Sequence, residues 1–198
     1  MLARVLERFT EQTRGVVTRA QEEARLMRHG RVGTEHLLVA LAWAGGEDAT
    51  AVLGKHGLTG ERARALVVHL VGLGEEDEAG DVPFSPAARD ALEAAWPEAM
   101  LLGHDRVEPS HLMLAAIRPQ DAVARRGLTS AGAPPPEVRS ELLRRLSEGR
   151  PATPANPGSP HADGQALLAI LERHGAIAAW LRERGVDEQA VRRMLGDE

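Results

Sequence analysis

The sequence contains an internal duplication that covers most of its length. Residues 9–74 and residues 84–149 align without a gap at a constant offset of 75 positions. Identical residues recur in the segments expected to be helices and in the turns between them. Examples are the pairs Phe9 and Phe84, Arg14 and Arg89, Glu23 and Glu98, His29 and His104, and His36 and His111. A register held over this length indicates a duplicated structural unit.

Composition favours an all-α protein. Alanine, leucine and arginine dominate the 198 residues, and cysteine and tyrosine are absent. These common residues have high helix propensity, and the absence of cysteine excludes disulfides and thiolate chemistry. The formal net charge of −5 argues against a nucleic-acid-binding role, which needs a basic face. Because no apolar run approaches the roughly 20 residues of a membrane span, we expect a soluble, cytoplasmic protein.

Each copy is expected to form four short helices. In the first copy they span about residues 10–27, 34–43, 47–56 and 59–71, and in the second about residues 85–102, 109–117, 121–131 and 134–146. Thr10 and Ser85 are the expected N-caps of the two opening helices. Gly57 and Gly132 are the expected C-caps of the third helices.

The chain continues beyond the duplicated segment. Repeat 1 spans about residues 1–74 and repeat 2 about residues 82–148, which together give one domain over residues 1–148. Residues 149–163 are rich in Pro and Gly and are expected to form a linker. Residues 164–198 match the second half of repeat 1 and are interpreted as a helical half-repeat. Such a unit cannot bury its apolar face alone, so we expect it to dock on the body or on a second chain.

Several motifs resemble the Clp N-terminal repeat. They are Ala20-Gln-Glu-Glu-Ala24, Arg31-Val-Gly-Thr-Glu-His-Leu-Leu38, Pro83-Phe-Ser-Pro-Ala-Ala88 and Gly103-His-Asp-Arg-Val107. The resemblance covers residues 1–148 and is strongest to the N-terminal domain of ClpC unfoldases. It implies a compact pseudo-twofold domain of two tandem four-helix repeats. Such a domain docks substrates, adaptor proteins and phosphoarginine-marked chains for an ATP-driven unfoldase.

The motor of such an unfoldase has no counterpart in these residues. The 198 residues contain no Gly-x4-Gly-Lys-Ser/Thr phosphate loop, and no nucleophile–base pair or metal cluster can be assembled from them. We therefore expect a stand-alone, non-enzymatic binding protein without a cofactor, a monomer or homodimer that modulates ClpC-dependent proteolysis. Its expected partners are ClpC adaptors, client proteins, phosphoarginine proteins or cyclic-peptide antibiotics. The alternative is an assembly role, in which the half-repeat mediates dimerisation or covers the docking face.

Val32, Gly33, Thr34 and Glu35 form a candidate phosphoarginine site in repeat 1. A glycine before a helix start lets a ligand approach the backbone, and helix N–H groups there favour an anion. A carboxylate beside them can accept a guanidinium in a charge-assisted grip. The resemblance implies that Glu35 binds the guanidinium of the modified arginine. The alternative is an ordinary helix start, in which Thr34 caps the helix and Glu35 complements its dipole.

The second repeat departs from this motif. It has Glu108-Pro109-Ser110-His111 where repeat 1 has Gly-Thr-Glu-His, so the guanidinium acceptor is missing and we expect no phosphoarginine binding there. His36 and His111 occupy equivalent positions, but no metal-binding residue follows four positions later. We expect both to be buried structural histidines, and His29 and His104 to be turn or capping residues.

A second candidate surface lies where the first helices of the two copies face each other. The resemblance implies that this face binds adaptors and cyclic peptides. The corresponding residues are Leu6, Arg14, Gln21, Phe84, Arg89, Glu93 and Trp96. A large aromatic side chain among arginine and glutamate is typical of an interaction hot spot. The alternative is that Phe84 and Trp96 belong to the hydrophobic core.

Overall fold

The computed structural model describes residues 5–75, 82–118 and 122–148, together with Gln189. The chain divides into two units, Met1–Arg150 and Pro151–Glu198. The expected linker and half-repeat therefore lie outside the described residues, apart from Gln189. Within the described ranges the regular structure is helical, with two isolated β-bridges, which confirms the all-α prediction.

The helices of the two repeats correspond one to one. Repeat 1 contributes α2 (Glu11–Leu26), α3 (Thr34–Ala44), α4 (Gly46–Lys55) and α5 (Gly60–Val71). Repeat 2 contributes α6 (Pro86–Leu101), α7 (Pro109–Ala116), α8 (Ala122–Ser130) and α9 (Pro135–Glu148). Every boundary lies within about two residues of its predicted position, which is the ordinary uncertainty of a helix end.

Local capping explains why the boundaries are where they are. Thr10 Oγ1 accepts a hydrogen bond from the Thr13 N–H at 3.2 Å, and Ser85 Oγ accepts one from the Ala88 N–H at 3.1 Å. After α4 and α8, Gly57 and Gly132 adopt φ angles of 65° and 73°. Glycine populates this left-handed region without the penalty that a Cβ imposes, so each helix stops there.

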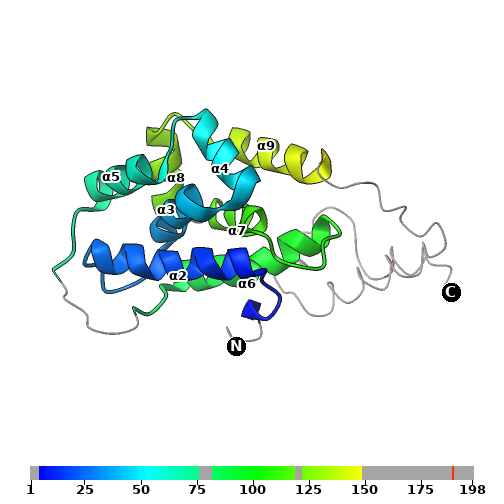
Figure 1. Cartoon of the computed structure of the whole chain (residues 1–198), viewed down its shortest axis with the longest axis horizontal. Helices are drawn as coiled ribbons and strands as arrows, with labels where there is room; N and C mark the ends of the chain where they lie inside the picture. Colours follow the sequence, from blue (N-terminus) through cyan, green and yellow to red (C-terminus); the bar gives the residue numbers. More distant parts are fainter. Residues whose placement is uncertain (1–4, 76–81, 119–121, 149–188, 190–198) are drawn as a thin grey trace. The chain divides into compact units, whose positions relative to one another are not determined.

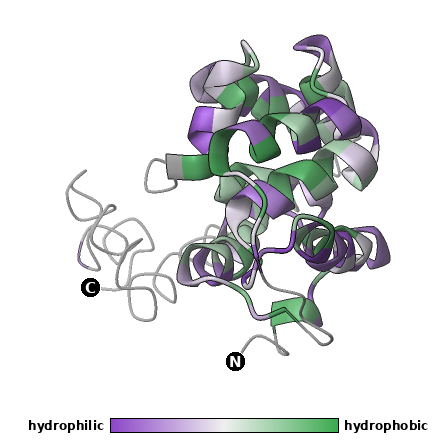
Figure 2. Ribbon diagram, turned by 90° about the vertical axis from the view of Figure 1, so that its left-hand side faces the viewer, coloured by the Kyte–Doolittle hydropathy of each residue, from purple (hydrophilic) through white to green (hydrophobic). Residues whose placement is uncertain are grey.

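The helices are arranged in layers (Figure 1). Helices α2 and α6 lie on one side, α3 and α7 occupy the centre, and α4, α5, α8 and α9 cover the other side. Figure 2 shows α2 and α6 end-on and next to each other below the rest of the fold. All eight residues of α7 are buried, as are seven of the eleven in α3. A helix that is apolar on every side needs neighbours all round, which explains why these two form the centre.

Two reciprocal β-bridges tie the repeats together. Phe9 pairs with Val107, and its duplicate Phe84 pairs with Val32, the duplicate of Val107. The residue that precedes each first helix is thereby bound to the loop that follows the first helix of the other repeat. Helices α2 and α6 consequently run antiparallel across a pseudo-twofold axis, as the resemblance implied.

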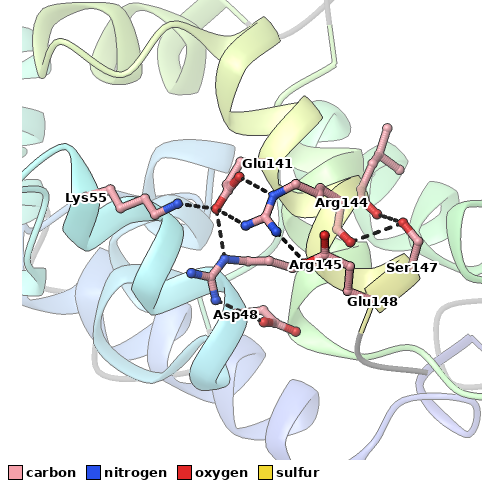
Figure 3. A network of polar contacts seen from close by, with 8 residues as sticks. Asp48, Lys55, Glu141, Arg144, Arg145, Ser147 and Glu148 are labelled. Atoms are coloured by element: carbon pink, nitrogen blue, oxygen red, sulfur yellow. Dashed lines mark hydrogen bonds and ion pairs between the residues drawn. The ribbon is translucent and has the colours of Figure 1, made fainter. Parts of the chain in front are cut away.

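An ion network joins α4 of repeat 1 to α9 of repeat 2 (Figure 3). Glu141 at its centre accepts hydrogen bonds from Arg144 at 2.8 and 2.9 Å and from Arg145 at 3.1 Å. Lys55 also donates to Glu141, and Arg145 reaches Asp48 at 3.4 Å. The arginine and lysine donors hold the pKa of Glu141 well below its ordinary value. The network is partly exposed, so it orients the two helices more than it stabilises them.

No single helix in the described ranges has the length and the apolar composition to cross a bilayer. Helices α3 and α4 reach that length and composition only as a pair, and the pair is bent by 102°.

Candidate functional site

The N-terminal turn of the described chain, residues 5–8, lies against both α2 and α6 (Figure 1). The Arg14 side chain of α2 donates from Nε to the Leu6 carbonyl at 3.1 Å. The Arg8 guanidinium lies 4.1 Å from the centre of the Trp96 ring of α6. An arginine stacked on tryptophan at this distance is a cation–π contact worth about 0.5–1 kcal/mol at an exposed site. These contacts place Arg14 and Trp96 beside the same N-terminal turn, which also carries Leu6.

Two more residues predicted for this surface, Arg89 and Glu93 of α6, are polar and at least partly accessible. Arg89 is exposed and Glu93 is half-buried, and neither side chain makes a hydrogen bond or ion pair with a described residue. Pro97 lies within α6 and cannot donate to the Glu93 carbonyl one turn earlier. Unused donors and acceptors beside an aromatic ring are what a protein partner requires. We give the name α2–α6 face to the residues predicted for docking together with Arg8, namely Leu6, Arg8, Arg14, Gln21, Phe84, Arg89, Glu93 and Trp96; the contacts described join Leu6 to Arg14 and Arg8 to Trp96.

The two aromatic residues of the α2–α6 face are neither core nor fully exposed. Phe84 and Trp96 are half-buried and pack against the edge of the core, whereas Phe9, the duplicate of Phe84, is completely buried. Arg8 belongs to the face although the sequence predicted no role for it. No local pattern reports a contact between residues 88 positions apart in sequence, so sequence reasoning could not have found this one.

Glu35 lies at the start of α3, and its carboxylate folds back over the preceding glycine. A Cβ atom on Gly33 would lie 2.2 Å from Glu35 Oε1. Gly33 has a φ angle of −95°, which any residue adopts, so a Cβ here would conflict with the present position of the Glu35 carboxylate and not with the backbone conformation. The Glu35 side chain is 15% exposed, which leaves its carboxylate at the surface edge of the helix start.

The other residues of the candidate phosphoarginine site are engaged within the fold. Val32 is fully buried, and its N–H donates to the Pro83 carbonyl at 2.8 Å. The Gly33 N–H donates to Nδ1 of His36, also at 2.8 Å, so neither of these N–H groups is available to an anion. Gly33 is the N-cap of α3, which corrects the expectation that Thr34 caps it; Thr34 is the first helical residue and is buried.

A histidine relay supports the start of α3. His36 Nδ1 accepts from the Gly33 N–H, so the neutral ring carries its proton on Nε2. That Nε2 lies 2.9 Å from His29 Nδ1, and His29 Nε2 lies 3.1 Å from the Gly72 carbonyl. The four groups form one ordered chain of donors and acceptors with both rings neutral. The relay ties the loop after α2 to the start of α3 and to the end of α5.

The second repeat contains the same pair. His111 Nδ1 accepts from the Glu108 N–H at 2.9 Å, and His111 Nε2 lies 2.6 Å from His104 Nδ1. Burial, with a smaller contribution from the neighbouring ring, lowers the pKa of His36 from 6.5 to about 3 and the pKa of His111 to about 4. The sequence predicted the buried histidines, whereas the loop histidines are their partners and not simple turn residues.

One cluster in the described ranges has the composition of a metal site. His29, Glu35 and His36 each bring one ligand atom to within 4.8 Å of the others. Both nitrogens of His36 are already used, one by the Gly33 N–H and one by His29. Glu35 approaches Nδ1 of His36 at 3.4 Å, whereas His29 approaches the opposite nitrogen. Because the ring nitrogens of both histidines are used in the relay, we assign the two histidines to it and not to a metal site.

The profile of the Clp repeat (R) N-terminal domain family matches residues 8–99 and again residues 83–166. The starts of the two matches differ by 75 residues, which is the offset of the duplication.

Curated relatives agree with this family. The chain is 36% identical over 189 residues to the chloroplastic chaperone protein ClpC1 of Oryza sativa subsp. japonica. It is also 36% identical to the chloroplastic ClpA homolog of Brassica napus, the ATP-binding subunit of an ATP-dependent Clp protease. In both cases the alignment covers 96% of this chain and 20% or 21% of the relative. The chain thus spans about a fifth of the length of these relatives.

Solved structures share the fold. The N-terminal domain of ClpD from Arabidopsis thaliana superposes with a TM-score of 0.62 at 26% identity, covering 71% of this chain and 96% of that one. The N-domain of ClpV from Vibrio cholerae gives a TM-score of 0.60 at 20% identity, covering 74% and 90%. A complex of a ClpV N-domain with a VipB peptide gives 0.58 at 20% identity, covering 75% and 92%.

Proposed function

Because this chain belongs to the Clp repeat (R) N-terminal domain family, we propose that it is a non-enzymatic docking module that binds adaptor proteins or substrates of a Clp unfoldase. The relatives that support this proposal are ClpC and ClpA chaperone subunits. A neighbour in fold, the ClpV N-domain, was solved with a bound peptide. Binding of this kind adjusts which proteins reach the unfoldase and needs no catalytic group in the docking module.

The α2–α6 face is the proposed docking surface. The observation that carries the proposal is the stack of Arg8 on the half-buried Trp96, on the helix whose Arg89 and Glu93 side chains pair with no residue in the described ranges. An aromatic ring held rigid by a guanidinium presents apolar area at low entropic cost. The flanking charges can fix the orientation of a partner. Cyclic peptides with apolar and polar groups of matching spacing are proposed to compete for the same face.

Phosphoarginine is the proposed second ligand, at Glu35. The observation that favours it is the partly exposed carboxylate of Glu35 at the start of α3. Gly33 has no side chain that would clash with this carboxylate. A carboxylate there can take a guanidinium in two hydrogen bonds. Because the Val32 and Gly33 N–H groups bond within the fold, the proposal assigns only the guanidinium contact, to Glu35. Repeat 2 has Ser110 in place of Glu35, so the proposal concerns repeat 1 alone.

Calorimetric titration of the 198-residue chain with a Clp adaptor tests the docking proposal. The expected result is saturable binding with one adaptor per chain, and slower adaptor-dependent degradation when the chain is added in excess to a Clp unfoldase and its protease. Absence of heat with every adaptor tried, together with an unchanged degradation rate, would overturn the proposal. Phosphoarginine added during the titration shows whether the two ligands use separate sites.

A further inference from the structure

A cavity that is widely open to solvent lies outside the α2–α6 face, where α2 meets the corner between α3 and α4. Its volume is about 540 Å³, and it is lined by Gln12 and Gly15 of α2, Trp43 and Ala44 of α3, and Glu47 and Thr50 of α4. A Cβ on Gly15 would meet no atom within 4 Å, so this glycine leaves the cavity mouth open. A pocket of this size accepts one long side chain with room for water.

The indole of Trp43 is fixed in place although it is 38% exposed. A Cβ on Gly60 would lie 2.2 Å from the ring, so the indole packs flat on the backbone of α5. The guanidinium carbons of Arg19 and Arg64 lie 5.2 and 5.6 Å from the ring centre. A large aromatic surface that is rigid and partly exposed is a ready platform for a ligand.

The duplication shows that the fold does not require tryptophan here. The position equivalent to Trp43 in repeat 2 holds Arg118, which lies 3.8 Å from Glu98. In repeat 1 the equivalent carboxylate is that of Glu23. Its second ion pair, beside the one with Arg64, is with Arg19 at 2.8 Å. Each of the two carboxylates therefore pairs with two arginines of its own, and the Trp43 indole takes no part in these ion pairs.

The charged residue that lines the cavity, Glu47, favours a positively charged ligand. Glu47 makes no side-chain hydrogen bond or ion pair with any residue in the described ranges, and no cation lines the cavity. The nearby cations Arg19 and Arg64 are already bonded to Glu23. The lining thus combines an indole, small apolar surfaces and one unpaired carboxylate. This combination fits the aliphatic stem and charged head of an arginine or lysine side chain.

We propose that this cavity, the Trp43 pocket, binds a basic side chain of a docked polypeptide. Its indole packs against the aliphatic stem, and Glu47 pairs with the cationic head. The inference rests on the proposed docking function and adds to it a preference for basic segments in the partner. It assigns the preference to repeat 1 alone, because repeat 2 carries Arg118 and Asp90 where repeat 1 has Trp43 and Gly15.

Titration of the ¹⁵N-labelled full chain with acetyl-Ala-Arg-Ala-amide tests the Trp43 pocket. The indole N–H signal of Trp43, assigned with Trp43→Phe, is expected to shift and to saturate while that of Trp96 stays in place. The same peptide with citrulline, which keeps the shape but lacks the charge, is expected to give no saturating shift. Glu47→Gln is expected to weaken binding about fivefold, the size of an exposed ion pair. Glu137→Gln, on an exposed residue of α9 outside the pocket, is the matched control and is expected to change nothing.

Equal shifts with the arginine and citrulline peptides, or an unchanged affinity in Glu47→Gln, would overturn this inference. Circular dichroism of each variant shows whether it is folded. The docking function is tested separately, by adaptor binding. A chain that binds an adaptor and ignores the arginine peptide contradicts only the Trp43 pocket.

Discussion

Arg64 of α5 donates two hydrogen bonds, at 2.6 and 2.7 Å, to the carboxylate of the fully buried Glu23 of α2. These bonds raise the pKa of the Arg64 guanidinium. They also join the first and last helices of repeat 1 around α3. The duplicate pair is looser, because Arg139 approaches Glu98 at 3.2 Å. The duplication therefore provides two copies of one ion pair with different geometry.

Replacement of Glu23 by Gln is expected to lower the free energy of unfolding by about 2–3 kcal/mol, because it leaves two guanidinium groups without their buried anion. The matched substitution Glu98→Gln is expected to cost about 1 kcal/mol less, since its hydrogen bonds are longer and fewer. Urea unfolding followed by circular dichroism measures both. If Glu98→Gln loses as much stability as Glu23→Gln, the difference in hydrogen-bond geometry does not set the contribution of each pair to stability.

The caps, the buried face of α2 and the order of helices were predictable from sequence because they depend on residues close together in the chain. Thr10, Ser85 and Gly57 lie where a helix must begin or end, and Val17, Ala20 and Ala24 recur at helical spacing. The duplication implied that the two repeats share one structure, and the resemblance implied their pseudo-twofold arrangement.

The candidate site was predicted less completely. The sequence marked Trp96 but not Arg8, and it marked Glu35 but not the fold of its carboxylate over Gly33. The pairing of His29 with His36 and the cavity beside Trp43 also depend on the meeting of separate elements. Composition and periodicity carry no signal for such contacts, and a single sequence gives no covariation with which to find them.

Stability is expected to fall as the pH is lowered from 7.5 to 5.5. The unfolded chain titrates His36 and His111 near pH 6.5, whereas in the fold their pKa values lie at about 3 and 4. Between these values the unfolded state binds more protons, so stability rises with pH and is lost on acidification. Each histidine is expected to contribute a loss of about 1.4 kcal/mol at pH 5.5. Urea midpoints across this range measure the effect.

The variant His36→Gln separates the relay from other titrating groups. It is expected to be less stable than the parent at pH 7.5, because the Gly33 N–H and His29 lose their partner. It is also expected to show about half of the pH dependence, since only His111 remains buried and neutral. If His36→Gln keeps the full pH dependence of the parent's stability, the relay of His29 and His36 is not the source of that dependence.

The proposal for Glu35 predicts an asymmetry between the repeats. Glu35→Ala is expected to weaken the binding of a phosphoarginine peptide at least tenfold, roughly the loss of one charge-assisted pair. Ser110→Ala, at the duplicate position, is expected to leave the affinity unchanged. Gly33→Ala is expected to resemble Glu35→Ala in binding, because the new methyl group displaces the carboxylate. Fluorescence anisotropy with a labelled peptide compares the three, and equal loss in Ser110→Ala would remove the asymmetry.

Adaptor binding by variants of the α2–α6 face tests the central claim most directly. Trp96→Ala and Arg89→Ala are each expected to raise the dissociation constant for a Clp adaptor about tenfold or more, which is typical of hot-spot residues. Leu73→Ala, which truncates an apolar side chain that is 62% exposed elsewhere on the chain, is the control and is expected to stay within about twofold of the parent. If the face variants bind the adaptor as tightly as Leu73→Ala does, the α2–α6 face is not the docking surface.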